Sequence, residues 1–443
     1  MRGPGEILVI SCYELGRQPL AAAAALAGLE RAGFRPAALD VSVEKLAEEP
    51  LRRARLVAIS VPMHTALRLG VRVAARVREI DPAAHVALFG LYAILNAEHL
   101  LAKHCDTVLG GESVDLLVEL ARTLERGEAP PRSATSVARP RQEPVPSRGG
   151  LPLIDRYARL EVGGETRLVA SVEASRGCKH FCRHCPIVPV YRGKFVAVPR
   201  EQVLADIGQQ ISAGAQHVTF ADPDFLNGPT HALRIAREAS ARWPELTFDA
   251  TVKIEHLLQH QDLLPELARC GLLFVTSAVE SLNDEVLRAL RKGHTAADVP
   301  LALRAVREAG IELRPTLLPY TPWTRLRDLP DLFDFAVAHD LVDAIDPVQY
   351  TLRLLLPPGS ALLDGDEPRP WLRSFEPDGF GWNWQHEDQR VDALQRESAA
   401  LVHSRAESDA RETFALLRTL AGGGGRVPAP KRCIPRLTES WFC

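Results

Sequence analysis

The sequence lacks the features that would place it in a membrane, outside the cell or on nucleic acid. No apolar run approaches the roughly 20 residues of a membrane-spanning helix. Eight cysteines in 443 residues are too few for a small secreted scaffold held by disulfides. The formal net charge of -3 indicates no general affinity for nucleic acid. The N-terminus shows no long apolar stretch of a signal peptide, so we expect a protein of the reducing cytoplasm.

The most informative stretch contains three closely spaced cysteines. Cys178, Cys182 and Cys185 are spaced C-x3-C-x2-C and follow an apolar run at 168–172, which predicts a strand. Gly177 allows the chain to turn just before the first thiol. Thiolates on such a loop can converge on one soft metal centre. Because a four-iron cluster usually takes four thiolates and no fourth cysteine lies nearby, one iron would keep an open position.

Two simpler interpretations of these cysteines agree less well with the pattern. The three thiols, together with His180 and His184, could supply a tetrahedral structural zinc site. Such sites usually consist of two ligand pairs separated by a longer loop, and no second pair follows here. A disulfide framework requires a denser set of cysteines. The spacing therefore favours an iron–sulfur cluster.

The cysteine motif, with a strand before it and repeated strand–helix units after it, resembles the signature of the radical S-adenosylmethionine (SAM) superfamily. The resemblance implies that Cys178, Cys182 and Cys185 hold a [4Fe-4S] cluster whose fourth iron binds the amino and carboxylate groups of SAM. An electron from the cluster then cleaves a carbon–sulfur bond of SAM and releases a carbon radical. The resemblance also implies a small-molecule substrate and an electron donor such as flavodoxin or ferredoxin. His184 is a polar variant of the aromatic residue that usually precedes the third cysteine.

Residues 1–130 predict a doubly wound α/β domain. Short apolar runs, typical of buried strands, alternate with stretches that predict helices. This alternation favours a parallel sheet, whose ligands bind at the carboxyl ends of the strands. The expected strands are 7–11, 35–41, 56–61, 85–89 and 107–109.

This N-terminal domain resembles the cobalamin-binding-like domain that precedes the barrel of many radical SAM enzymes. The resemblance rests on Gln18-Pro19-Leu20, VAISVP, DPAAHVALFG and CDTVLGGES. The sequence has no D-x-H-x-x-G motif, so no histidine is placed to bind cobalt from below. Two expectations remain open: cobalamin binds without a protein ligand, or the domain is an empty scaffold. His64 follows the third strand, where a lone histidine is more often hydrogen-bonded than a ligand.

The rest of the chain divides into three parts. Residues 131–152 are rich in Pro, Ser, Arg and Gly, which indicates a linker. Residues 153–355 predict a partial (β/α)6 TIM-type barrel, and residues 356–443 a C-terminal extension with a long helix at 388–420. The whole chain is therefore expected to be α/β. The expected barrel strands are 168–172, 218–221, 248–252, 272–279, 311–318 and 348–352.

Polar residues follow or lie on the barrel strands near the end where such barrels carry catalytic groups. Asp222 and Asp224 close the second strand, and either carboxylate suits the ammonium group of SAM. Lys253, after the third strand, or Arg314, on the fifth, suits the SAM carboxylate, with ordinary salt bridges as the alternative. Glu280, at the end of the fourth strand, suits the ribose hydroxyls.

Two further motifs strengthen the resemblance to cobalamin-domain radical SAM enzymes. Phe220-x-Asp222-x-Asp224 is similar to their F-x-D-D segment. The segment Val279-Glu280-Ser281, followed by Leu287 and by RKGHT at 291–295, is similar to their ES…L…KGHT segment. Lys253 and Arg314 have no such support.

The C-terminal tail carries two cysteines beyond a glycine hinge. Four glycines at 422–425 precede Cys433 and the terminal Cys443, which follows two aromatic residues. The end resembles the tails of radical SAM proteins that finish in Cys-Cys or Cys-selenocysteine and then Ala-Glu-Pro. A selenocysteine codon read as a stop would leave this ending. The resemblance implies that the tail folds over the active site; a frayed terminus is the alternative.

These features predict a radical SAM enzyme and leave its reaction open. The tail resembles that of an enzyme that joins arsenic to the 3-amino-3-carboxypropyl part of SAM, and paired thiols suit such a soft element. Cys433 and Cys443 are therefore candidate catalytic ligands. A cobalamin-dependent methyltransferase is the alternative among enzymes. Outside enzymes, the alternative is a metal- or cobalamin-binding sensor with a structural cysteine site.

Overall fold

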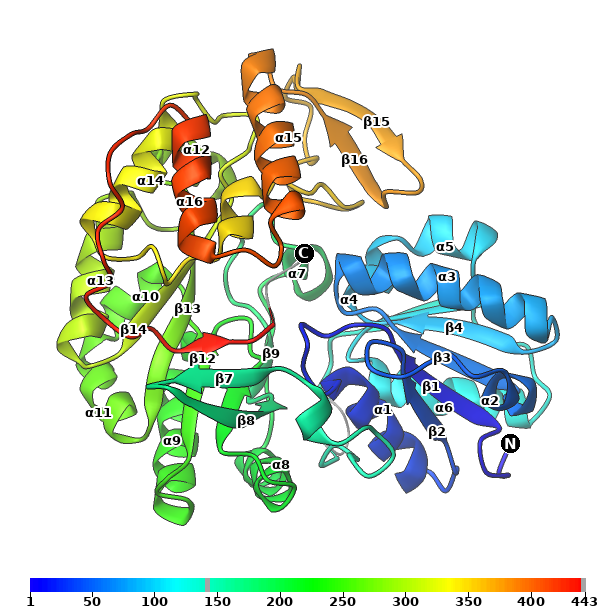
Figure 1. Cartoon of the computed structure of the whole chain (residues 1–443). Helices are drawn as coiled ribbons and strands as arrows, with labels where there is room; N and C mark the ends of the chain where they lie inside the picture. The colour runs from blue at the N-terminus through cyan, green and yellow to red at the C-terminus, as the bar shows by residue number, and fades with distance from the viewer. Residues whose placement is uncertain (140–143, 440–443) are drawn as a thin grey trace.

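The computed structural model describes residues 1–139 and 144–439. Two α/β units lie side by side, with the N-terminal unit in blue and cyan and the cysteine-containing unit in green and yellow (Figure 1). A C-terminal extension, in orange and red, packs against the second unit. No helix of the described ranges is both long and apolar enough to cross a membrane.

The N-terminal unit is a parallel sheet with strand order β2-β1-β3-β4-β5-β6. The chain order reverses between β1 and β3, and ligands of such sheets bind outside the carboxyl ends of the strands at this point. The strands are β1 Ile7–Ser11, β2 Ala37–Asp40, β3 Leu56–Ser60, β4 His85–Phe89, β5 Thr107–Gly111 and β6 Ser133–Ser136. The helices are α1 Leu20–Arg31, α2 Glu48–Arg53, α3 His64–Ile80, α4 Leu91–Leu95, α5 Ala97–Lys103 and α6 Ser113–Glu125.

The strand β6 lies within the stretch interpreted as a linker. Its four residues, SATS, are small or polar and alternate between exposed and half-buried positions at the sheet edge. Such a strand has no apolar run from which it could be predicted.

The second unit is a curled sheet with order β14-β13-β12-β11-β8-β7-β17, in which the first five are mutually parallel. Its strands are β7 Arg159–Val162, β8 Glu165–Val172, β11 His217–Phe220, β12 Thr247–Thr251, β13 Leu272–Glu280, β14 Glu312–Leu317 and β17 Arg436–Leu437. Its α-helices are α8 Arg200–Ser212, α9 Pro229–Arg242, α10 Ile254–Gln259, α11 Leu264–Arg269, α12 Asp284–Leu290, α13 Asp298–Glu308 and α14 Asp328–Ala338. Short 3-10 helices are η1 Ile154–Arg156, η2 Phe225–Asn227 and η3 Gln261–Leu263.

The stretch predicted as the sixth barrel strand has a different structure. It forms the 3-10 helix η4 Pro347–Thr351, and a single bridge between Tyr320 and Arg353 continues the sheet beyond it. Pro347 lacks a backbone N–H for a sheet ladder. The ring of Tyr350 stacks on Phe333, with centroids 4.4 Å apart, so the apolar run packs as a turn rather than as a strand.

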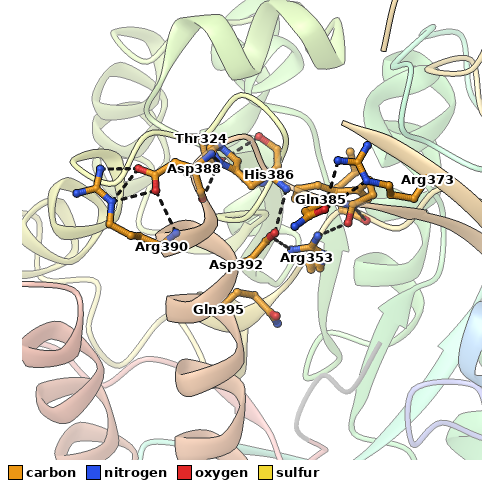
Figure 2. A network of polar contacts seen from close by, with 12 residues as sticks. Thr324, Arg353, Arg373, Gln385, His386, Asp388, Arg390, Asp392 and Gln395 are labelled. Carbon is orange, nitrogen blue, oxygen red and sulfur yellow. Dashed lines mark hydrogen bonds and ion pairs between the residues drawn. The ribbon is translucent and has the colours of Figure 1, made fainter. Parts of the chain in front are cut away.

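The C-terminal extension begins with the hairpin β15 Leu372–Glu376 and β16 Gly381–Trp384. Two helices follow, α15 Gln389–Ser404 and α16 Ala410–Leu420, in place of the one long helix expected. Figure 2 shows the polar network at the start of α15. The side chain of Arg353 donates to Asp392 and to the carbonyl oxygen of Trp384, and His386 contacts the carbonyl oxygen of Thr324. These bonds fix the extension to the end of the barrel.

The described part of the tail closes the open side of the barrel. After α16 the chain runs along the outside of the barrel and then passes beside β7 (Figure 1). There β17 pairs antiparallel with β7. Arg314 of β14 donates to the carbonyl oxygen of Pro435 across a distance of 2.9 Å. The last described residue, Glu439, accepts a hydrogen bond from Tyr13 of the N-terminal unit.

A buried arginine joins the two units. Arg148, from the linker, donates to Asp206 of α8 at 2.8 Å and to the carbonyl oxygen of Ser171 on β8 at 2.8 Å. It also donates to Gln18 of the N-terminal unit at 3.2 Å. Both members of the ion pair are at least nine-tenths buried. This buried ion pair, with its hydrogen bond to Gln18, is therefore one of the contacts that orient the two units.

We predict that Arg148→Ala lowers the free energy of unfolding by about 3–5 kcal/mol, because Asp206 would keep a buried and unpaired charge. Urea unfolding followed by circular dichroism measures the change. The double variant Arg148→Met/Asp206→Leu should recover most of the loss, because it removes both charges. Arg242→Ala, which breaks an exposed ion pair with Glu238, is the control, with an expected change of at most about 1 kcal/mol. A loss in Arg148→Ala no larger than in this control would contradict the prediction.

Candidate functional site

The three cysteines lie on the loop that follows β8, at the carboxyl end of the parallel strands. The short strands β9 Ser175–Gly177 and β10 Phe195–Ala197 pair at the base of this loop, and α7 Ile187–Tyr191 follows the third cysteine. Gly177 has φ of 74°, and a Cβ there would lie 2.4 Å from the carbonyl oxygen of Lys194. The turn before the first thiol therefore requires glycine.

One buried carboxylate fixes the approach to the loop. Asp222, directly after β11, accepts a hydrogen bond from the backbone N–H of Ala174 at 2.8 Å and another from the hydroxyl of Ser175. Burial raises the pKa of Asp222 to about 7. Both of its oxygens are thus used to hold the loop. Its predicted contact with the SAM ammonium group stays a prediction.

The cysteine side chains have the surroundings expected of cluster ligands. Cys182 is buried and Cys178 and Cys185 are half-buried, and no disulfide joins any cysteines of the described ranges. Burial raises the pKa of Cys178 and raises that of Cys185 to about 12. Thiols with raised pKa values keep their protons in the absence of a ligand. They lose the proton when they bind a strong electrophile, such as the iron of a cluster. The residues present fit a [4Fe-4S] cluster.

A buried ion pair lies beside the cysteines. Lys292 Nζ is 3.1 Å from Glu280 Oε1, and His184 Nε2 is 3.2 Å from the same oxygen. Glu280, at the end of β13, has φ of 65°, an uncommon conformation for a residue with a side chain. Burial alone would raise the pKa of Glu280, but Lys292 and His184 outweigh it and lower the pKa to about 2. Lys292 also interacts electrostatically with Cys182 and Cys185, so a fixed cation faces the thiol site.

A second polar group lies on the other side of the loop. Lys253 donates to Glu255 at 3.1 Å. His180 Nε2, on the loop itself, is 3.1 Å from His256 Nε2 of α10. Asp224 Oδ2 is 2.7 Å from His256 Nδ1 and is fully buried. The fold thus gathers Asp224 and Lys253 near the cysteine loop, where both were predicted to bind SAM; that role is still a prediction.

Two other predicted residues lie elsewhere. The guanidinium of Arg314 pairs with Asp346 at 3.0 Å and binds the tail backbone. Cys433 is exposed, next to Arg432, whose side chain pairs with Glu312 at the amino end of β14. This is the end of the barrel opposite the cysteine loop. Cys443 lies outside the described residues.

A cavity of about 300 Å³ lies between the two α/β units and is lined by residues of both. Its walls include Gly90 and Leu91 after β4, Gly177 before the cysteines and Ile187 after them. The carboxyl ends of both sheets and both flanks of the cysteine loop therefore border one space.

A buried ion pair and a hydrogen bond on the wall of this cavity connect the two units. Arg176 pairs with Glu112 at 2.7 Å and with Glu173 at 3.0 Å, and Tyr191 donates to Glu112 at 2.9 Å. Burial raises the pKa of Glu173 to about 8. Two acceptors on the wall, Oε1 of Glu14 and Oε1 of Gln202, are buried and have no hydrogen-bond partner in the described part of the chain.

Sequence reasoning missed several of these residues. Lys292 lay inside the RKGHT motif without an assigned role, and only the turn after α12 brings it to Glu280. Glu112 is adjacent to Gly110-Gly111, a motif that was noted, but its partners come from the other unit. His256, Gln202 and Glu14 lie in stretches with no distinguishing signal.

Three comparisons with known proteins agree with this architecture. Residues 172–333 match the family model described as the radical SAM superfamily. Among curated proteins, the tRNA-2-methylthio-N(6)-dimethylallyladenosine synthase of Vibrio campbellii is 23% identical over 247 residues, 52% of this chain and 48% of that protein. The corresponding protein of Haemophilus influenzae is 25% identical over 242 residues, 51% of this chain and 47% of its own. The chain thus spans about half the length of these relatives.

Solved structures extend the likeness to the N-terminal unit. The cobalamin-dependent SAM radical enzyme OxsB, with aqua-cobalamin and SAM bound, covers 90% of this chain at a TM-score of 0.67 and 13% identity, over 67% of its own length. The radical SAM methyltransferase TsrM of Kitasatospora setae covers 76% at a TM-score of 0.58 and 17% identity, over 70% of its own length. At these identities the likeness shows the fold, and it confirms the predicted α/β class with a partial barrel. Residues 172–333 therefore carry a radical SAM enzyme domain.

Proposed function

We propose that this chain is a cobalamin-binding radical SAM enzyme that transfers a carbon group to a small-molecule substrate. The observation that carries the proposal is the cavity between the two units, which borders both the carboxyl ends of the N-terminal sheet and the cysteine loop. A cofactor held by the first unit would face the site at which the second unit binds SAM. The resemblance to OxsB and TsrM supports the same arrangement.

Within this proposal, Cys178, Cys182 and Cys185 hold a [4Fe-4S] cluster, which supplies the electron for SAM cleavage. Asp222 positions the loop through its bonds to Ala174 and Ser175. Lys292 places a buried positive charge close to an anionic cluster, which favours its reduced form. An electron donor such as flavodoxin or ferredoxin would provide the electron, and we propose that the protein works in the reducing cytoplasm.

The cavity has polar groups that suit the amide-bearing edge of a corrin. Oε1 of Glu14 and Oε1 of Gln202 are buried acceptors that no described residue contacts by a hydrogen bond, and amide N–H groups of cobalamin can donate to them. Among the described residues, no histidine lines the cavity. His64 Nε2 is 2.7 Å from the carbonyl oxygen of Gly379 and is engaged there. These contacts support cobalamin binding without a histidine below the cobalt.

Transfer of the 3-amino-3-carboxypropyl group of SAM to a soft element such as arsenic is the second candidate reaction. It rests on the tail cysteines. Glu439 contacts Tyr13 at 2.8 Å, so the tail does approach the junction between the units. Cys433, however, lies at the opposite end of the barrel from the cysteine loop, and its role as a soft ligand stays a prediction.

We predict that the anaerobically reconstituted protein holds about four iron atoms per chain, as a four-iron cluster requires. Cys182→Ala should lose nearly all of this iron and the brown charge-transfer absorption, because it removes the buried thiolate of the set. Iron analysis and absorption spectroscopy measure both. Cys270→Ala, a half-buried cysteine on the outer side of the barrel, is the control and should keep the cluster. Tightly bound zinc without iron uptake would contradict the assignment.

We predict that Gln202→Leu weakens hydroxocobalamin binding by about 2- to 13-fold, the equivalent of one hydrogen bond of about 0.5–1.5 kcal/mol. Equilibrium dialysis followed by absorption spectroscopy gives the dissociation constant. Gln389→Leu, an exposed position at the start of α15, should bind as the unchanged protein does. If the unchanged protein binds no cobalamin, the N-terminal unit is a scaffold.

The SAM-derived product separates the two candidate reactions. Cleavage that generates the 5'-deoxyadenosyl radical leaves 5'-deoxyadenosine, whereas transfer of the 3-amino-3-carboxypropyl group leaves 5'-methylthioadenosine. We expect 5'-deoxyadenosine when the reconstituted enzyme is reduced anaerobically and its products are separated by chromatography. Formation of 5'-methylthioadenosine that falls in Cys433→Ser and Cys443→Ser would instead favour the tail-dependent reaction.

A further inference from the structure

Three side chains at the cysteine loop bring their polar atoms close together, and two of these atoms have no hydrogen-bond partner among the described residues. His180 comes from the loop, Asp224 from the end of β11 and His256 from α10, and one ligand atom of each lies within 4.8 Å of the others. The described residues show no other such group of histidine, cysteine and carboxylate side chains. The cysteines of the cluster are separate from it.

Hydrogen bonds within the described part of the chain do not satisfy all the polar atoms of this group. Asp224 Oδ2 is fully buried and has no hydrogen-bond partner among the described residues, although His256 Nδ1 is only 2.7 Å away. Nδ1 of His256 likewise makes no hydrogen bond within the described residues, so its geometry does not suit a hydrogen bond to the carboxylate. The other carboxylate oxygen, Oδ1, accepts from the backbone N–H of Leu226 at 3.2 Å. A hydrogen bond between the two imidazoles, whose Nε2 atoms are 3.1 Å apart, would still leave Oδ2 without a partner. A buried carboxylate oxygen without a hydrogen bond is costly unless a proton or a cation compensates it.

We propose that His180, His256 and Asp224 bind a divalent transition metal ion such as zinc(II), at a site distinct from the iron–sulfur cluster. Two imidazoles and one carboxylate are a common ligand set for such ions. The ion would join the cysteine loop to two neighbouring segments of the barrel mouth.

Two of the separations between ligand atoms are close to those of a metal centre. Ligand atoms about 2.0–2.1 Å from a tetrahedral zinc ion lie about 3.3 Å from one another. The separation of the two Nε2 atoms is 3.1 Å, and that of His180 Nε2 from Asp224 Oδ2 is 3.9 Å. These values lie on either side of the ideal separation.

The outer partners of His180 also match a metal site. Its Nδ1 is 3.4 Å from Glu255 Oε2, and the same oxygen accepts from Lys253 at 3.1 Å. A carboxylate on Nδ1 keeps the hydrogen there and leaves Nε2 free as the ligand atom. Glu255 is therefore a positioning residue for the proposed ion.

The test uses the anaerobically reconstituted full chain, so that iron already occupies the cysteines. Zinc chloride is added, and its affinity is measured by competition with a chromophoric chelator. We expect one zinc ion per chain in addition to the cluster iron. His256→Gln should bind zinc at least tenfold more weakly, and Glu255→Gln about 10- to 100-fold more weakly. His260→Gln is the matched control, because His260 neighbours His256 without belonging to the group, and it should bind as the unchanged protein does.

Iron content is measured in the same samples, so loss of the cluster and loss of the second metal are read separately. His256 is on α10, outside the cysteine loop, which makes its variant informative even if His180→Gln disturbs cluster assembly. Equal zinc affinity in His256→Gln and the unchanged protein overturns the proposal. Displacement of zinc by saturating SAM also overturns it, because Asp224 would then serve the SAM ammonium group instead.

Discussion

The candidate site depends on the fixed path of the chain between β8 and the first cysteine. Asp222 holds this path from the neighbouring strand, with one oxygen on the backbone of Ala174 and the other on the hydroxyl of Ser175. The adjacent turn at Gly177 tolerates no side chain, because a Cβ would meet the carbonyl oxygen of Lys194. Together the carboxylate and the glycine set where the thiols begin. The position of any group that binds to the thiols is therefore set by Asp222 and Gly177.

Around the loop, buried carboxylates lie close to lysine and histidine side chains. On one side, Lys292 and His184 keep Glu280 ionised despite its burial. On the other, Lys253 balances Glu255, whereas Asp224 has two imidazoles nearby and no hydrogen bond to its inner oxygen. On the first side, Glu280 Oε1 has Lys292 and His184 within 3.2 Å. On the second, Oδ2 of Asp224 has no hydrogen bond among the described residues, and this difference is why we place an additional cation there rather than at Glu280.

Polar contacts connect the two α/β units. Arg148 joins the linker to α8 and β8, and Arg176 of the cysteine loop reaches Glu112 of the N-terminal unit. Polar contacts of this kind leave a cavity with both charged and apolar walls, instead of a closed hydrophobic seam. A ligand that carries both an apolar ring and hydrogen-bonding side groups suits such walls.

The sequence by itself determined the local features of this protein. Strand–helix alternation predicted both α/β units, and the spacing of Cys178, Cys182 and Cys185 predicted one metal-binding loop at a strand end. Periodicity failed where tertiary contacts outweigh local preference. The apolar run at 348–352 packs as η4 against Phe333, and the polar SATS segment becomes the edge strand β6.

Only the tertiary structure decided which distant residues share a site. Arg314 and Lys253 were equal candidates for the SAM carboxylate, yet Arg314 binds the tail and Lys253 lies near the cysteine loop. His180 and His256 are 76 residues apart along the chain, and their rings meet only because α10 follows a neighbouring parallel strand. Local spacing specifies groups on one loop, because backbone geometry alone sets their distances. Groups on different elements are brought together by sheet curvature and helix packing, which depend on the whole chain.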